Sequence, residues 1–412
     1  MPSTRALAAL ALTLAAAGTT TALVRPSAAS TPAHRPHSML TLGRTLAHTS
    51  APSTGLVPPA PPCPLPKVTI PVPSTPIPLV GGDTTVGPCV MVPELAGTGA
   101  PVMGNMAYWG GKVQVHPRVY LVYLGWGRDG AFTDDCAPVK LVEGSIRATL
   151  KCDPDGAGKK MADFVSQLGG TTWAGSQTQY YQVVNGVKTY IHNDRDQLGG
   201  IWVDDATKTS AKISYRDMAV EADKARQHFG IKDKDLINAN VVILQPQHFS
   251  DPKAQDVGYC AWHDIIEPSV VPAEFKGLKA GLPFTNMPYV LNQGSGCGEN
   301  LVNSGQAGRL DGFTIALGHE IEEAVTDPGA EDRLGGTAIG GWFDPLDANE
   351  NGDKCAYVGS NLLMGGTIGG FPGGGGDIKG NRGGLFPVQS LWSNAAAGGL
   401  GYCAGAGTDL GF

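Results

Sequence analysis

Apolar side chains gather in three short runs that predict buried strands. Residues 113–127 are rich in β-branched and aromatic side chains and end in Gly-Trp-Gly, and residues 239–244 read Ala-Asn-Val-Val-Ile-Leu. A third strand is predicted to end at residues 289–291, next to Pro288. Short apolar runs bounded by Gly or Pro are typical of strands inside a sheet.

Three further segments have apolar residues at the spacing of a helix, namely residues 161–168, 215–229 and 311–326. Because helices alternate with strands along the chain, we expect an α/β or α+β domain rather than an all-β sandwich. Residues 98–412 are long enough to form one such domain with insertions.

The first 97 residues follow a different pattern. Residues 1–29 contain Arg5, an Ala- and Leu-rich run and then small residues, which predicts a signal peptide and a secreted, extracellular protein. That run is too short to cross a bilayer, and no later apolar run is long enough either, so no membrane span is expected. Residues 30–97 are dense in proline and are predicted to form a Pro-rich extension, either a linker or a propeptide.

The cysteines and charges narrow the class of protein. Eight cysteines in an exported chain favour four disulfides, although one or more could stay free or bind metal. A net charge of -7, with no basic stripe, argues against nucleic acid as a partner. Pairing by sequence neighbours gives Cys63–Cys89, Cys136–Cys152, Cys260–Cys297 and Cys355–Cys403.

A glycine-rich segment, residues 365–384, invites a phosphate-loop interpretation. It lacks the Gly-Lys-Ser/Thr sequence and the strand-to-helix context of such loops. We therefore expect a flexible surface loop there.

The predicted helix at residues 311–326 has the composition of a metal-binding helix. Asp311 is the candidate N-cap, and Asp327-Pro328 ends the helix. His319 and Glu323 are four residues apart and project from the same flank, so both can reach one metal ion. The predicted buried face consists of Phe313, Leu317, Ile321 and Ala324.

Glu320 lies between the two candidate ligands in sequence and points to the neighbouring strip of the helix. There it could hold a water molecule and accept its proton as a general base. The pattern follows the His-Glu-x-x-His logic of zinc peptidases, with a carboxylate in place of the second imidazole. The alternative is an ordinary helix with a polar side, but the chain has no Gly-x-Ser-x-Gly elbow to anchor a serine hydrolase.

Five ordered motifs resemble a group of secreted bacterial proteins with the pattern His-Glu-x-x-Glu-Ala-x-Thr-Asp-Pro, Trp-Tyr-Asp, Glu-Ile-Gly-Asp-x-Cys. The group is similar to the plant Exordium, or phosphate-induced, cell-wall proteins. The chain departs from the pattern at Asn351, where isoleucine is expected, and in the insertion at residues 329–340. The motifs are Gly258-Tyr-Cys-Ala-Trp-His263, Gly318-His-Glu-Ile-Glu-Glu-Ala-Val-Thr-Asp-Pro328, Gly341-Trp-Phe-Asp344, Asn349-Glu-Asn-Gly-Asp-Lys-Cys355 and Val388-Gln-Ser-Leu-Trp-Ser-Asn394.

The resemblance leaves the third metal ligand open. Asp344 lies 21 residues after Glu323, close to the separation found in glutamate zinc peptidases. Glu350 and Asp353 belong to the motif that the bacterial and plant patterns share, which favours Glu350. Asp327 is a weaker candidate, because it has an alternative role in the turn at the end of the helix.

One loop and one further histidine each allow more than one interpretation. Residues 347–353 place oxygen ligands at alternate positions like the start of a calcium loop, but Val358 stands where a bidentate Glu is needed. His263 could orient a substrate or the metal shell, or serve as a structural histidine beside Cys260.

The resemblance implies a zincin-like domain with an active-site helix. The implied function is a zinc-dependent endopeptidase that acts on protein or peptide substrates, with His319, Glu323 and Glu350 on Zn²⁺ and Glu320 as general base. The rival expectation is a non-catalytic cell-surface or signalling protein, associated with the cell wall, in which the metal is structural.

Overall fold

A single strand, β3 (Arg118–Leu124), organises the domain because both of its faces are apolar. Val119 and Leu121 face one core, whereas Val122 and Leu124 face another, and all four are at most 1 % exposed. A strand that is covered on both faces is typical of a parallel sheet with helices on each side.

The computed structural model confirms this expectation. It describes residues 38–41, 105–133, 136–208, 213–251, 254, 259–266, 276–329, 340–344, 349–356, 367–368, 371–372, 375–396 and 401–404. The predicted signal peptide at residues 1–29 and the pair Cys63–Cys89 lie outside the described residues. No helix in the described ranges is long and apolar enough to cross a membrane.

The main sheet has six strands in the order β1-β10-β11-β9-β3-β8. The strands β8, β3, β9 and β11 run parallel, β10 runs antiparallel to β11, and β1 pairs antiparallel with the outer side of β10. The strands other than β3 are β1 (Ser38–Thr41), β8 (Leu198–Asp204), β9 (Ala239–Leu244), β10 (Tyr259–Ile265) and β11 (Pro283–Met287).

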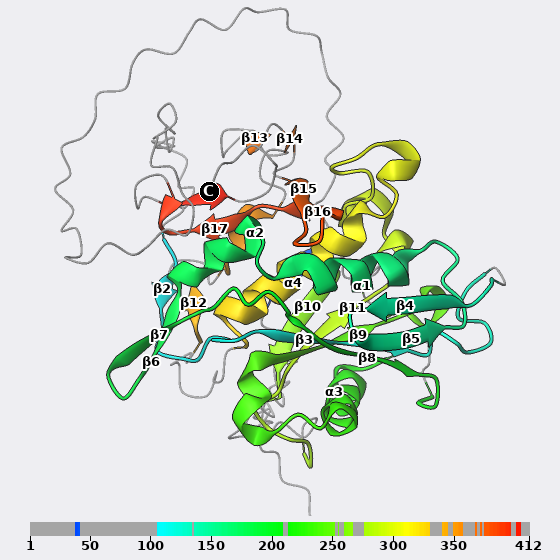
Figure 1. Cartoon of the computed structure of the whole chain (residues 1–412), viewed down its shortest axis with the longest axis horizontal. Helices are drawn as coiled ribbons and strands as arrows, with labels where there is room; N and C mark the ends of the chain where they lie inside the picture. Colours follow the sequence, from blue (N-terminus) through cyan, green and yellow to red (C-terminus); the bar gives the residue numbers. More distant parts are fainter. Residues whose placement is uncertain are drawn as a thin grey trace, which may run out of the picture. The chain divides into compact units, whose positions relative to one another are not determined.

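Helices cover both faces of the sheet (Figure 1). The helices α1 (Ala157–Leu168) and α4 (Asp311–Thr326) pack on one face, and α3 (Tyr215–Phe229) packs on the other. The domain is therefore a mixed α/β structure, as predicted.

The ends of α3 are encoded locally, which is why the predicted bounds are correct. Ser214 and Asp217 form a capping box at the start, and Gly230 ends the helix in the left-handed conformation at φ 66°. The helix α1 begins four residues before the predicted start, because Asp153 accepts the backbone N–H groups of Gly158 and Lys159.

The helix α4 has the predicted bounds but differs from the prediction in two respects. Leu310 occupies the N-cap position, and the Asp311 carboxylate instead accepts the backbone N–H groups of Val302 and Asn303. All residues of α4 are buried, not only the predicted apolar face. The helix is enclosed because α1, the main sheet and a hairpin formed by residues 375–389 surround it.

One strand prediction and one loop prediction need correction. The third predicted strand lies earlier in the chain, as β11, and residues 290–292 form a 3₁₀ helix. Part of the glycine-rich segment, expected to be a flexible loop, forms strand β15 (Gly375–Lys379) paired with β16 (Leu385–Gln389). This hairpin packs against α4, so it is part of the core structure around that helix.

Short two-stranded sheets and one short helix, α2 (Thr172–Gly175), complete the described elements. The pairs are β2 (Ala107–Tyr108) with β12 (Trp342–Phe343), β4 (Val139–Glu143) with β5 (Ile146–Leu150), β6 (Tyr181–Val184) with β7 (Val187–Tyr190), β13 (Thr367–Ile368) with β14 (Phe371–Pro372), and β17 (Leu391–Ser393) with β18 (Tyr402–Ala404).

Three of the four predicted disulfides are confirmed. They are Cys136–Cys152, Cys260–Cys297 and Cys355–Cys403.

Candidate metal centre

The histidine and glutamates of α4 face a buried cluster of ligand-type side chains. His319 Nε2 lies 3.1 Å from Glu323 Oε2, as expected for residues one turn apart. The side chains of His319, Glu320 and Glu323 are 0 % exposed. The pattern seen in the sequence therefore projects into the protein interior rather than into solvent.

Gln389, at the end of β16, fixes the orientation of the His319 ring. Its amide nitrogen donates to the carbonyl oxygens of Gly352 and Ser390, so its Oε1 must accept from His319 Nδ1, at 3.1 Å. With a proton on Nδ1, Nε2 is the nitrogen that faces the cluster, and in the neutral ring its lone pair is available to a metal, as in metal-binding histidines.

His263, on β10, enters the cluster from the opposite side. Its Nε2 donates to the backbone carbonyl of Asp327 at 2.9 Å, and its Nδ1 lies 3.1 Å from Glu320 Oε2 and 3.8 Å from Glu323 Oε2. The outer nitrogens of both histidines are thus held by amide or carbonyl oxygens, and their inner nitrogens face the same two glutamates.

Two more carboxylates come from the 3₁₀ helix η9 (Asp353–Cys355) and from the segment just before it. Glu350 Oε1 lies 3.6 Å from His263 Nε2, and Asp353 Oδ1 lies 3.6 Å from His319 Nε2. The Asp353 backbone N–H also donates to Glu323 Oε1 at 2.8 Å. Both carboxylates of the shared motif, those of Glu350 and Asp353, therefore lie beside the buried cluster of α4.

Gly352 allows this close approach. A Cβ atom at this position would lie 2.7 Å from His319 Nδ1 and 2.9 Å from Glu323 Oε1, closer than side-chain contacts permit. The backbone of the segment is therefore in direct contact with two candidate ligands.

Burial and charge shift the proton affinities of the cluster. Burial lowers the pKa of His263, but the hydrogen bond and charge of Glu320 and the charge of Glu323 outweigh it and raise that pKa to about 9. For His319, burial again lowers the pKa, and mainly the Glu323 charge raises it well above its usual value. Burial raises the pKa of Glu320 to about 7. The pKa of Glu350 is raised well above its usual range by burial and by the charge of Glu323.

The cluster fits a divalent cation. Ligand atoms of His319, Glu320 and Glu323 lie within 4.8 Å of one another, and so do those of His263, Glu323 and Glu350. Within the described residues, the buried atoms His319 Nε2 and Glu320 Oε1 have no hydrogen-bond partner. A buried concentration of imidazole nitrogens and carboxylate oxygens is the donor set that zinc takes in proteins.

The other ligand candidates have different roles. Asp344 pairs with the ammonium group of Lys354. Asp327 Oδ1 accepts the backbone N–H of Gly341 at 3.1 Å, which fits the turn role given as its alternative. Neither carboxylate belongs to the groups of close ligand atoms found in the described parts of the chain.

The calcium interpretation of residues 347–353 stays a prediction, because Asp347 lies outside the described residues. In the described part, the Asn351 amide donates to Gln177 Oε1 and to the Glu322 carbonyl oxygen. That side chain therefore holds the loop against the domain.

The role of Gln389 was missed at the sequence level. The only signal was its place in the motif at residues 388–394, which points to importance but not to a contact with His319.

The class of protein rests on the fold and on this cluster. Comparison of the chain with protein-family models, with curated proteins and with solved structures found no match. The resemblance of the five motifs to the secreted bacterial group therefore stays an expectation, and the function of the chain is a proposal that rests on the geometry of the cluster.

Proposed function

We propose that this chain is a secreted zinc-dependent endopeptidase. The observation that carries the proposal is the buried pair of histidines, each with its outer nitrogen held by an amide or carbonyl oxygen and its inner nitrogen turned to Glu320 and Glu323. Residues that only pack a helix do not need this arrangement. A bound metal accounts for both the orientations and the buried carboxylates.

Each residue has a distinct role in the proposed site. His319 and Glu323 hold zinc, and Glu350 supplies the third ligand. When bound, zinc supplies an activated water molecule and polarises the substrate carbonyl. Glu320 accepts a proton from the reacting water, and His263 positions the Glu320 carboxylate through their hydrogen bond.

The edge of the sheet supports a peptide as the substrate. Outside β10, an extended segment of the chain, β1, pairs antiparallel with the strand that carries His263, and it also contacts α4 and η9. Extended peptides commonly bind by adding a strand to such an edge. A helix with metal ligands beside an antiparallel edge strand is the arrangement on which we class the domain as zincin-like.

One observation favours the rival function, a non-catalytic extracellular or cell-wall protein with a structural metal. His263, His319, Glu320 and Glu323 are all 0 % exposed, and structural zinc sites are closed to solvent. The two functions differ in what they require of Glu320, because a structural site has no need of a general base.

Two substitutions test the proposal, one at the proposed general base and one at a proposed zinc ligand. Glu320→Gln should retain zinc and fold but lose peptidase activity on the order of a hundredfold or more, because it removes the general base. His319→Ala should lose zinc and activity together. Metal content by elemental analysis and cleavage of a peptide library measure both.

Glu322→Gln is the control. Burial raises the pKa of Glu322 to about 8, so this side chain is largely neutral at pH 7 and a glutamine resembles it. It lies outside the groups of close ligand atoms in the described residues, so zinc content and activity should be unchanged. Equal cleavage by wild type and Glu320→Gln would disprove the mechanism, and a wild type that binds zinc but cleaves no peptide would favour the structural role.

A further inference from the structure

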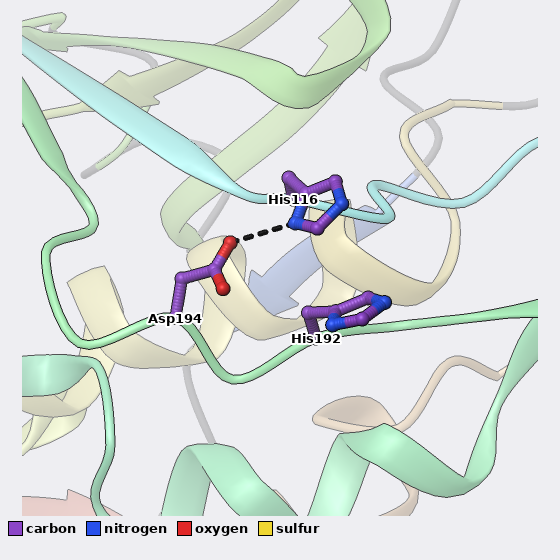
Figure 2. A group of neighbouring side chains, drawn as sticks. All are labelled: His116, His192 and Asp194. Carbon is purple, nitrogen blue, oxygen red and sulfur yellow. Dashed lines mark hydrogen bonds and ion pairs between the residues drawn. The ribbon is translucent and has the colours of Figure 1, made fainter.

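A second group of ligand-type side chains, largely exposed to solvent, lies just before the start of β3. His116 precedes β3, and His192 and Asp194 follow β7 in the connection to β8. Figure 2 shows the three side chains turned toward one another from these two neighbouring segments. His116 Nδ1 lies 2.8 Å from Asp194 Oδ2, and the two imidazole rings stack with centroids 4.4 Å apart.

The backbone on each side of the group is held in place. The His192 N–H donates to the Val115 carbonyl oxygen at 2.8 Å, which joins the two histidine segments directly. The His116 N–H donates to Asn238 Oδ1 at 3.1 Å. The ligand-type side chains thus extend from fixed positions, so little ordering is needed for them to act together.

The segment that carries Asp194 is held as firmly. Asn193 accepts the Gly170 N–H at 2.7 Å and donates to the Thr171 carbonyl oxygen at 2.8 Å. Gly169 packs so closely that a Cβ there would lie 2.0 Å from the Asp194 carbonyl oxygen. The turn after α1 therefore fixes the backbone that carries Asp194.

We propose that His116, His192 and Asp194 form a solvent-accessible site for a divalent transition metal such as zinc. Their ligand atoms all lie within 4.8 Å of one another. Tetrahedral zinc with bonds of about 2.0–2.1 Å needs ligand atoms roughly 3.4 Å apart, which small rotations of these side chains provide. Two imidazoles and one carboxylate suit zinc or copper and disfavour magnesium or calcium, which prefer oxygen ligands.

The exposure of the site distinguishes it from the buried cluster. The side chains of His116 and Asp194 are 53 % and 43 % exposed. The remaining coordination positions face solvent, so the metal should exchange readily and should respond to the free zinc concentration. The alternative is a surface ion pair between His116 and Asp194 that binds nothing.

Zinc binding by the intact chain tests this site independently of the peptidase proposal. Equilibrium dialysis against Zn²⁺ at pH 7.5 should give two equivalents for wild type, one for His192→Ala and one for His319→Ala. Asp194→Asn keeps the shape of the site but removes the charge, and should weaken binding of the exposed equivalent by about tenfold or more. If the buried cluster binds no zinc, wild type should give one equivalent and His192→Ala none.

His228→Ala is the matched control, because His228 is another exposed histidine, stacked on Trp202. It should leave the stoichiometry of wild type unchanged. Zinc uptake that is the same in wild type, His116→Ala and His192→Ala would overturn the proposal and leave only the ion pair. Near-native thermal unfolding of each metal-free variant would exclude misfolding as the cause of a lost equivalent.

Discussion

Gly352 is the residue on which the geometry of the buried cluster depends most directly. It lies between Glu350 and Asp353, and its backbone touches the His319 ring and the Glu323 carboxylate. Its φ of -77° is open to any residue, so the requirement for glycine is one of space alone. The carbonyl of Gly352 also accepts from Gln389, which links this backbone to the orientation of His319.

We expect Gly352→Ala to weaken zinc binding on the order of ten- to a hundredfold, because the new methyl group displaces two ligands. Competition with a chelator of known affinity measures the change. Gly175→Ala is a control for the buried equivalent alone, because a Cβ there meets the Asn193 amide, at 3.2 Å, which belongs to the segment of the second site. Zinc affinity equal to that of wild type would show that the segment moves away at no cost and that Gly352 does not position the ligands.

At the level of residues, sequence could predict only the part of the cluster that lies on one helix. The spacing of His319, Glu320 and Glu323 fixes their neighbourhood once α4 forms. His263 and Gln389 reach the cluster through strand pairing and packing, which no local spacing encodes. The second group, His116 with His192 and Asp194, was not predicted for the same reason.

At the level of elements, local signals decided which predictions were correct. The strand β9 and the helices α3 and α4 have the predicted bounds, because apolar periodicity marks all three and, in α3, capping residues mark both ends. The prediction placed the third strand too late in the chain, because β11 carries the buried polar residues Thr285 and Asn286, which interrupt the apolar run. Those side chains are placed by neighbouring strands, for example by the hydrogen bond from Thr285 to Asn240.

The disulfides allow a prediction about η9. The Cys355–Cys403 bond joins η9 to β18 over a sequence separation of 48, and Cys355 lies two residues after Asp353. Replacing both cysteines by serine should lower the free energy of unfolding by about 4 kcal/mol and should also weaken zinc binding. Chemical denaturation and chelator competition measure the two effects.

The Cys136–Cys152 bond provides the comparison. Its sequence separation is 16, and it joins residues on either side of the β4–β5 hairpin. Its removal should lower the free energy of unfolding by about 3 kcal/mol without changing zinc affinity. If both double variants weaken zinc binding equally, then general loss of stability, not the position of η9, controls the metal.

At the level of the whole molecule, the Pro-rich extension is the least predictable part. The sequence predicts residues 30–97 to be a linker or propeptide, and within this range residues 38–41 form β1 at the edge of the sheet. The pairing depends on β10, more than two hundred residues away, so local composition could not reveal it.

We expect this strand to restrain the proposed peptidase. Proline disfavours strand pairing, so Leu40→Pro should weaken the pairing of β1 with β10, in which Leu40 lies opposite Ala261. A loss of about 1 kcal/mol, that of one hydrogen bond, corresponds to about fivefold higher activity. Leu40→Ala keeps the backbone and should change activity less. Faster amide hydrogen exchange in β10 without a gain in activity would show that β1 pairs with the edge but does not block the substrate.

The covalent link between β1 and the domain has a further consequence. A tethered segment meets its binding edge at an effective concentration that depends on the length of the connection and not on how dilute the protein is. A free peptide of equal affinity must reach that concentration to displace it. Cleavage between β1 and residue 105 would end this advantage, and β1 would then be lost by simple dilution, which would make release practically irreversible.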